Sequence, residues 1–169
     1  MPPPADSARA ASFQEAAAFH QAFQDLLRLH GARDRERLSS YGVTPSGARA
    51  VETLVRLGPV SLNRLATELF VDKSTASRVV GCLEDRGLVR RETAPEDRRA
   101  LRLLLTPAGR AVAAQLADDA VWEMHALLGA FAPEARRETL RFLRRLTRAS
   151  ATHAGVTDAA CCRLPAGEE

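Results

Sequence analysis

The sequence predicts a mainly α-helical fold with one small β-hairpin, arranged as a winged helix-turn-helix lobe between long flanking helices. Three observations lead to this prediction. Ala, Leu and Arg dominate the composition and aromatic residues make up only 5%, which favours helix over sheet. Apolar residues recur at steps of three and four along most of the chain. Between residues 88 and 105 this period changes to two, which is typical of strands.

The N-terminal part predicts a tail followed by a long helix. Residues 1–11 are Pro- and Ala-rich without an apolar period, so we expect a loose tail there. A helix is predicted over residues 12–40, because apolar residues from Phe13 onward recur at steps of three and four, and Ser12 with Glu15 has the spacing of a capping box at its start. The charged run Arg33–Arg37 is expected to form its solvated last turns.

Residues 41–106 are predicted to form the winged lobe. Thr44-Pro45 predicts a helix start, and Gly58-Pro59 predicts its end. Five apolar residues would line one side of this helix: Ala48, Val51, Leu54, Val55 and Leu57.

Two shorter helices are predicted next. Ser61 is the cap candidate for one that stops near Phe70-Val71, and Asp72 for another that Gly87 closes in a left-handed conformation. Their lengths of about eight and fourteen residues, with about three between them, match a helix-turn-helix.

A hairpin is predicted directly after this pair of helices. Leu88–Thr93 forms one strand candidate, Ala94–Arg98 a polar turn, and the next residues a second strand. This second strand would turn three leucines to the core: Leu101, Leu103 and Leu105. A hairpin in this place is a wing.

The C-terminal part repeats the cap-plus-proline signal at Thr106-Pro107. A long helix is predicted from there to Gly129-Ala130, and Pro133 opens a last helix. Together they occupy residues 107–150, and residues 151–169 are predicted to be a flexible tail.

Composition excludes several classes of protein. No window approaches the ~18 uninterrupted apolar residues of a membrane span, and the N-terminus lacks the layout of a signal peptide. Three cysteines, two of them adjacent, make no disulfide framework. The sequence has no nucleophile elbow, phosphate-binding loop or spaced His/Glu metal pair. We therefore expect a cytoplasmic, non-enzymatic protein without a membrane partner.

The net charge of +3 is too small to establish a nucleic-acid partner, but the charge is unevenly distributed. Six arginines, which suit phosphate and guanine, lie close together in the sequence: Arg86, Arg90, Arg91, Arg98, Arg99 and Arg102.

Four blocks carry a resemblance to a known family. Asp72–Val80 followed by Leu83–Arg91, and Pro95–Ala100 followed by Leu105–Arg110, resemble the multiple antibiotic resistance regulator (MarR) family in order and spacing. The resemblance is clear from about Gly42 to Leu116. It implies a homodimeric regulator that binds double-stranded DNA, with the first and last helices interlocked as a helical dimerisation domain.

The resemblance makes the helix from Asp72 the recognition helix. The N-terminal half of such a helix reaches base edges in the major groove. Its candidate DNA-binding residues are Lys73, Ser74, Thr75, Ser77 and Arg78. Short hydroxyl side chains fit close to bases, and Arg78 is long enough to reach guanine or phosphate.

The wing supplies a second predicted contact. In the family a wing arginine two residues after an aspartate enters the minor groove, and Asp97 and Arg99 match that pair. Arg98 is predicted to contact phosphate, and of the alternating Arg90 and Arg91 one is expected to face DNA. Three residues at the start of the helix before the recognition helix are predicted phosphate anchors: Ser61, Asn63 and Arg64.

An effector pocket between the long helices and the winged lobe is also implied by the resemblance. The matching region offers His20, Phe23 and His30 but no cysteine, which argues against a peroxide sensor. Trp122 with Met124 is interpreted as interface core.

The cysteines give two further expectations. Cys82 is predicted to be a buried thiol on the inward half of its helix. Cys161 and Cys162 are adjacent thiols, which suit a soft metal or trivalent metalloid better than a mutual disulfide.

Three functions remain open at this stage. The first is a homodimeric repressor of a palindromic operator, released by a small ligand or a thiol-reactive metal or metalloid. The others are a thiol-based metal-binding or redox protein that uses the cysteine pair, and a winged-helix protein-interaction module. The polar, arginine-bearing face of the recognition helix favours the repressor, because partner-binding helices usually carry apolar anchors.

Overall fold

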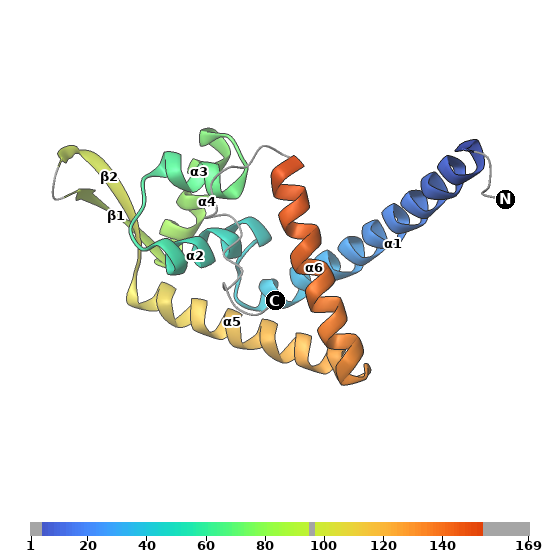
Figure 1. The fold of residues 1–169 in the computed structure, drawn as a ribbon. Coiled ribbons are helices and arrows are strands. Elements are labelled where there is room, and N and C mark those ends of the chain that lie inside the picture. Colours follow the sequence, from blue (N-terminus) through green and yellow to red (C-terminus); the bar gives the residue numbers. More distant parts are fainter. Residues whose placement is uncertain (1–4, 95–96, 154–169) are drawn as a thin grey trace.

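The computed structural model describes residues 5–94 and 97–153, and side chains over 12–93 and 101–153. Over these residues the fold is mainly helical with one antiparallel hairpin, as predicted (Figure 1). The elements are α1 (Ala5–Ser40), α2 (Pro45–Leu57), α3 (Leu62–Leu69), α4 (Lys73–Asp85), β1 (Val89–Ala94), β2 (Asp97–Leu105), α5 (Pro107–Leu128) and α6 (Pro133–His153).

The four N-caps predicted for the lobe and for α5 are present. Thr44 Oγ1 accepts the Gly47 N–H at 3.1 Å, Ser61 Oγ the Arg64 N–H at 3.2 Å and Thr106 Oγ1 the Gly109 N–H at 3.0 Å. Asp72 caps α4 in the same way. Each cap satisfies a backbone donor that the first helical turn leaves without a partner.

Both outer helix ends differ from the prediction. α1 begins at Ala5, so Ser12 and Glu15 lie inside the helix and form no capping box at its start. The stretch before them is rich in alanine, the best helix former, and carries the helix further without an apolar period. α6 likewise continues to His153, past the predicted end at residue 150.

The core lies inside the winged lobe, where α2, α3, α4 and the base of the hairpin meet. Its most deeply buried large side chains are Val51, Leu65, Val80 and Leu103. The hairpin register pairs Val89 with Leu105 and Arg91 with Leu103. Leu103 and Leu105 are buried as predicted.

Two residues predicted to face the core do not. Leu101 is 53% exposed, because it lies further out along the hairpin than the part that the helices cover. Val55 of α2 is 59% exposed, since the buried side of α2 centres on Ala50, Val51 and Leu54.

The flanking helices leave much apolar surface uncovered. α1 extends away from the lobe as a long arm, while α5 leads from the hairpin to α6 (Figure 1). No described residue of α6 is buried. The large exposed apolar residues on these helices include Phe13, Phe19, Phe23, Leu26, Leu27, Leu29, Val121, Trp122, Met124, Leu127, Leu140, Phe142 and Leu143. Phe19 contacts both Phe23 and Phe142, at ring-centroid distances of 6.0 and 5.9 Å.

Polar contacts fix the C-terminal part of α1 on α5. Arg33 Nε lies 2.8 Å from Glu123 Oε1, and Arg37 donates to the Leu116 carbonyl oxygen at 3.2 Å. The prediction that Arg33–Arg37 forms solvated last turns is therefore wrong for Arg37, whose side chain is only 20% exposed and reaches a helix 79 residues later in the sequence, whereas Arg33 stays 63% exposed. Across the described residues, no helix is both long and apolar enough to cross a membrane.

Candidate nucleic-acid interface

The helix α4 has one buried face and one polar outward face. Ala76, Val80 and Leu83 are buried against the lobe. At about 100° per residue, Ser74 and Arg78 lie on the opposite side of the helix, and both are exposed. The outward face of α4, defined as Ser74, Arg78, Gly81, Cys82 and Asp85, therefore runs along the helix away from the core.

The other predicted residues of α4 lie beside this face. Lys73 is exposed, whereas Thr75 and Ser77 are half-buried at its edges. The structure thus places Ser74 and Arg78 centrally among the five candidates.

Asp72 organises the start of α4 through several hydrogen bonds. Its Oδ1 accepts the Thr75 N–H at 2.8 Å and the Ser74 hydroxyl at 2.5 Å, and its Oδ2 accepts the Thr75 hydroxyl at 2.7 Å. The Ser74 hydroxyl, followed by the Thr75 N–H, holds the pKa of Asp72 well below its usual range. Asp72 is therefore a carboxylate at neutral pH, placed at the positive end of the helix dipole.

Thr75 links this cap to Arg78. Arg78 Nη2 donates to Thr75 Oγ1 at 3.3 Å, while the same hydroxyl donates to Asp72. Arg78 is thus held at the end of a short chain of hydrogen bonds. From the sequence Asp72 is predicted only as a cap; its spacing of three from Thr75 is the signal that could have indicated this contact.

The wing is tied to α4 by an ion pair. Arg91 Nη2 lies 3.1 Å from Glu84 Oε2. Arg91 shares the Leu103 side of the hairpin, because directly paired residues point to the same face. Arg90 points to the opposite side, where its guanidinium lies 2.6 Å from Glu92. The structure therefore leaves Arg90 exposed on the wing and engages Arg91 with α4.

Asp97, Arg98 and Arg99 stand at the start of β2, next to the hairpin turn. Asp97 pairs with Ala94, and the register shifts between Thr93 and Ala94. The side chains of these three wing residues lie outside the described part, so the predicted minor-groove pair stays a prediction.

The anchors predicted on α3 have different surroundings. Ser61 acts as the helix cap, and Asn63 is exposed. Arg64 Nη2 lies 2.7 Å from Glu68, whose side chain is only 5% exposed and also contacts Arg56 of α2 at 2.5 Å. This ion-pair cluster was missed in the sequence, because Arg56 and Glu68 belong to different helices.

Arg86, one of the clustered arginines, lies against the turn between α1 and α2. Its Nη2 donates to the Tyr41 carbonyl oxygen at 3.2 Å. Gly42 adopts φ +62°, and a Cβ at this position would lie 1.9 Å from Arg86 Nη2. Gly42 thus leaves space for the Arg86 guanidinium, whose hydrogen bond to Tyr41 stabilises the turn between α1 and α2.

The predicted effector residues lie outside the main apolar cavity. A cavity of about 470 Å³ lies between α2, α5 and the end of β2, lined by residues that include Leu54, Val55, Leu105, Arg110 and Ala113. His20, Phe23 and His30 do not line it. His30 instead borders a pocket of about 230 Å³ between α1 and α5, whose lining combines charged residues such as Asp34 and Glu123 with the apolar Met124 and Leu127.

The cysteine expectations have separate outcomes. Cys82 is exposed, so the prediction of a buried thiol is wrong: it lies on the outward face of α4, next to Leu83 but turned away from the core. Cys161 and Cys162 lie outside the described residues. Within the described ranges, no group of three or more His, Cys, Asp or Glu side chains is placed to hold a metal ion.

A helix-turn-helix followed at once by a hairpin, with a polar outward face on its second helix, defines the winged helix-turn-helix class. The model of the MarR family matches residues 41–100, which span α2 to the first residues of β2. Over this winged lobe the chain is similar to the MarR family.

Curated relatives are regulators by name. A Thauera aromatica protein, provisionally named a transcriptional regulatory protein for the hcr operon, is 35% identical over 108 residues, which cover 63% of this chain and 64% of the relative. YsmB of Bacillus subtilis, an uncharacterized regulator of the helix-turn-helix type, is 29% identical over 80 residues, or 47% of this chain and 55% of YsmB. The chain thus spans somewhat under two thirds and about half of these relatives.

Solved structures share the fold over most of its length. A MarR family transcription regulator has a TM-score of 0.76 at 24% identity, over 88% of this chain and 98% of its own. A MarR family protein from Bacillus stearothermophilus has a TM-score of 0.75 at 22% identity, with 82% and 96% covered. RV1404 of Mycobacterium tuberculosis has a TM-score of 0.70 at 28% identity, with 80% and 94% covered.

Proposed function

We propose that this chain is a homodimeric, sequence-specific DNA-binding transcription regulator that acts as a repressor on a palindromic operator. The observation that carries the proposal is the outward face of α4, where Ser74 and Arg78 stand opposite a fully apolar buried side. The second helix of a helix-turn-helix reads the major groove with its N-terminal residues. The curated relatives, which are named as transcriptional regulators, support the same assignment.

Exposed apolar surface on the flanking helices supports a homodimer. Trp122 is 72% exposed on α5, Phe13 is 79% exposed on α1, and α6 buries none of its described residues. Soluble monomers rarely expose large apolar patches, and a second copy is a common way to cover such helices. A two-fold dimer would present two winged lobes to two half-sites, which is why we expect a palindrome.

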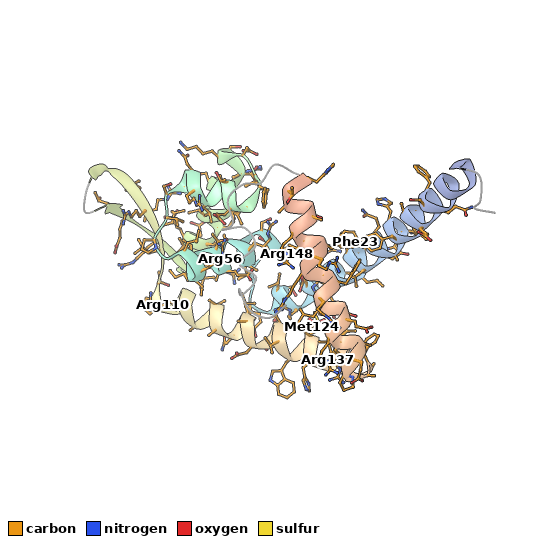
Figure 2. All side chains as sticks on the ribbon, in the orientation of Figure 1. Phe23, Arg56, Arg110, Met124, Arg137 and Arg148 are labelled. Atoms are coloured by element: carbon orange, nitrogen blue, oxygen red, sulfur yellow. The ribbon has the colours of Figure 1, made fainter. Side chains whose placement is uncertain are left out.

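To test the DNA-binding proposal, a pool of random-sequence DNA duplexes is incubated with the purified protein, and the duplex that binds best is enriched and identified. This enriched sequence is called the selected duplex. Arg78→Ala should weaken binding to the selected duplex by about 1–3 kcal/mol if Arg78 reads a base. Arg99→Ala should weaken it severely, because an arginine in a narrow minor groove meets concentrated negative potential. Arg137→Ala is the matched control, since Arg137 lies on α6 far from the wing (Figure 2). Unchanged affinity in both lobe variants would contradict the proposed interface.

Release from DNA is the second part of the proposal. The apolar cavity between α2, α5 and β2 supports a small amphipathic effector, with Arg110 as its cationic group. The adjacent Cys161 and Cys162 support release by a soft metal or trivalent metalloid. Arsenite should then release wild-type protein from DNA but not a variant carrying Cys161→Ser and Cys162→Ser. Equal release of both proteins would remove the cysteine pair from the mechanism.

A further inference from the structure

The hydrogen bonds around Asp72 fix the direction in which the Ser74 hydroxyl donates its proton. Resting on the proposed DNA-binding function, we propose that Ser74 acts as a hydrogen-bond acceptor that selects an exocyclic amino group, the N6 of adenine or the N4 of cytosine, in the major groove. Ser74 is thereby a specificity-determining residue and not a phosphate anchor.

The direction of the Ser74 bond follows from its partner. An ionised carboxylate can only accept hydrogen bonds, so the hydroxyl 2.5 Å from Asp72 Oδ1 must point its proton at Asp72. A hydroxyl has a single proton and two acceptor lone pairs. Only the lone pairs of Ser74 are left to face outward, and turning the hydroxyl round would break a charge-assisted bond.

The position of Ser74 directs those lone pairs at the groove. Ser74 is exposed and stands with Arg78 opposite the buried residues Ala76 and Val80. It also lies in the first turn of α4, the part of a recognition helix that comes closest to the bases.

The chemistry of DNA then decides what Ser74 accepts. Phosphate oxygens, guanine N7 and O6, and thymine O4 are all acceptors, so none of them can donate to Ser74. The major-groove donors are the amino groups of adenine and cytosine. A Ser74 held by Asp72 therefore favours one of these two bases on the strand that it contacts.

Thr75 differs from Ser74 although both hydroxyls donate to Asp72. Thr75 is half-buried, and its Oγ1 also accepts from Arg78 at 3.3 Å. Its bonding capacity is largely used within the protein, which makes Thr75 a positioning residue for Arg78.

The test removes one amino group at a time from the selected duplex. Each adenine is replaced by purine and each cytosine by pyrimidin-2-one, which lack the exocyclic amino group, and affinity is measured by fluorescence anisotropy. With wild-type protein one replacement should weaken binding by about 3- to 10-fold, the effect of one neutral hydrogen bond. With Ser74→Ala the intact duplex should bind correspondingly more weakly, and the same replacement should cause no further loss. Comparing the two proteins cancels the effect of the weakened base pair.

Two variants complete the design. Ser77→Ala, the same substitution on a residue without a bond to Asp72, should keep the wild-type dependence on that amino group. Asp72→Asn keeps a good helix cap but lets the amide donate, so Ser74 no longer has to. A pool selected on Asp72→Asn should admit thymine or guanine at the position concerned.

The outcomes separate this inference from the proposed function. If wild type and Ser74→Ala lose the same affinity at every replacement, or if Asp72→Asn selects the same base as wild type, the inference is wrong while DNA binding stands. If no sequence is enriched from the pool, the proposed function fails and the inference with it. If Ser74→Ala does not fold, the inference is still tested by the base replacements measured with wild-type protein and by the sequences that Asp72→Asn selects.

Discussion

Arg91 of β1 and Glu84 of α4 form an ion pair of 3.1 Å that joins the wing to the helix proposed to read the major groove. The two residues are close in sequence but lie on different elements, separated by the turn at Gly87 with φ +68°. The pair therefore helps to set the direction in which the hairpin leaves the lobe, and with it the distance between the two proposed DNA contacts.

A double-mutant cycle measures this coupling. Glu84→Gln, Arg91→Gln and the double variant should show a coupling of about 0.2–1 kcal/mol in the free energy of unfolding, the usual range for a partly exposed pair. The coupling should shrink in ~1 M salt, where screening is strong. Strictly additive losses in chemical denaturation would show that the pair contributes nothing to the junction.

Phe70 predicts an unusual effect of glycine on stability. It adopts φ 55°, ψ 43° at the end of α3, where its N–H bonds to the Thr67 carbonyl and the Val71 N–H bonds to the Ala66 carbonyl. This Schellman arrangement favours glycine, because a left-handed residue with a Cβ is strained. Phe70→Gly should be more stable than Phe70→Ala by roughly 0.5–1 kcal/mol, the reverse of the usual order in helices. Since both variants remove the ring, which is 61% exposed, a more stable alanine variant would contradict the strain.

Gly81 predicts opposite changes in stability and binding. It lies within α4 on its outward face, and a Cβ there would meet no atom within 4 Å. Gly81→Ala should therefore raise the free energy of unfolding by about 0.5–1 kcal/mol. Gly81→Leu should fold as well but bind the selected duplex more weakly, because its side chain blocks the approach of α4 to the groove. Undiminished binding of the leucine variant would mean that α4 does not approach the major groove closely enough for the side chain at position 81 to interfere.

Cys82 offers a chemical probe of the same face. In a protein with Cys161→Ser and Cys162→Ser, Cys82 is the remaining thiol and is exposed. N-ethylmaleimide should then abolish DNA binding, and bound duplex should slow the alkylation, because the thiol shares the outward face of α4 with Arg78. Further substitution of Cys82→Ser should make binding insensitive to the reagent. A fully alkylated protein that still binds DNA would place the interface elsewhere.

Tyr41 predicts a dependence on alkaline pH. Its hydroxyl donates to Asp119 of α5, and this bond raises the pKa of Tyr41 above its ordinary value. In the folded chain Tyr41 keeps its proton above the pH at which it ionises in the unfolded chain, so this stabilisation is complete below pH ~10 and is lost as pH rises through the folded pKa.

Tyr41 is the sole tyrosine in the sequence, so phenolate absorbance reports on it alone. Asp119→Asn should return its titration toward the ordinary tyrosine range, and Tyr41→Phe should lose less stability than wild type between neutral and strongly alkaline pH. An unchanged titration in Asp119→Asn would contradict the assigned cause.

The sequence by itself determined the order of the elements and the start of most helices. Thr44, Ser61, Asp72 and Thr106 were predicted as caps and are caps, because a cap bonds to a residue three positions along and needs nothing from the rest of the fold. The strand period likewise located the hairpin. Composition was less reliable at the N-terminus, where an alanine-rich stretch without an apolar period proved helical from Ala5.

Tertiary structure decided which side chains are available to a partner. Arg86 and Arg91 stand in one basic cluster with Arg90, yet the first bonds to the Tyr41 carbonyl, the second pairs with Glu84 of α4 and the third pairs with Glu92 of its own strand. Cys82 proved to be exposed for the same reason, since a small error in the angular position of a residue on a helix exchanges core for solvent. Contacts between elements depend on how those elements pack in three dimensions, and one sequence read along its length contains no direct record of that packing.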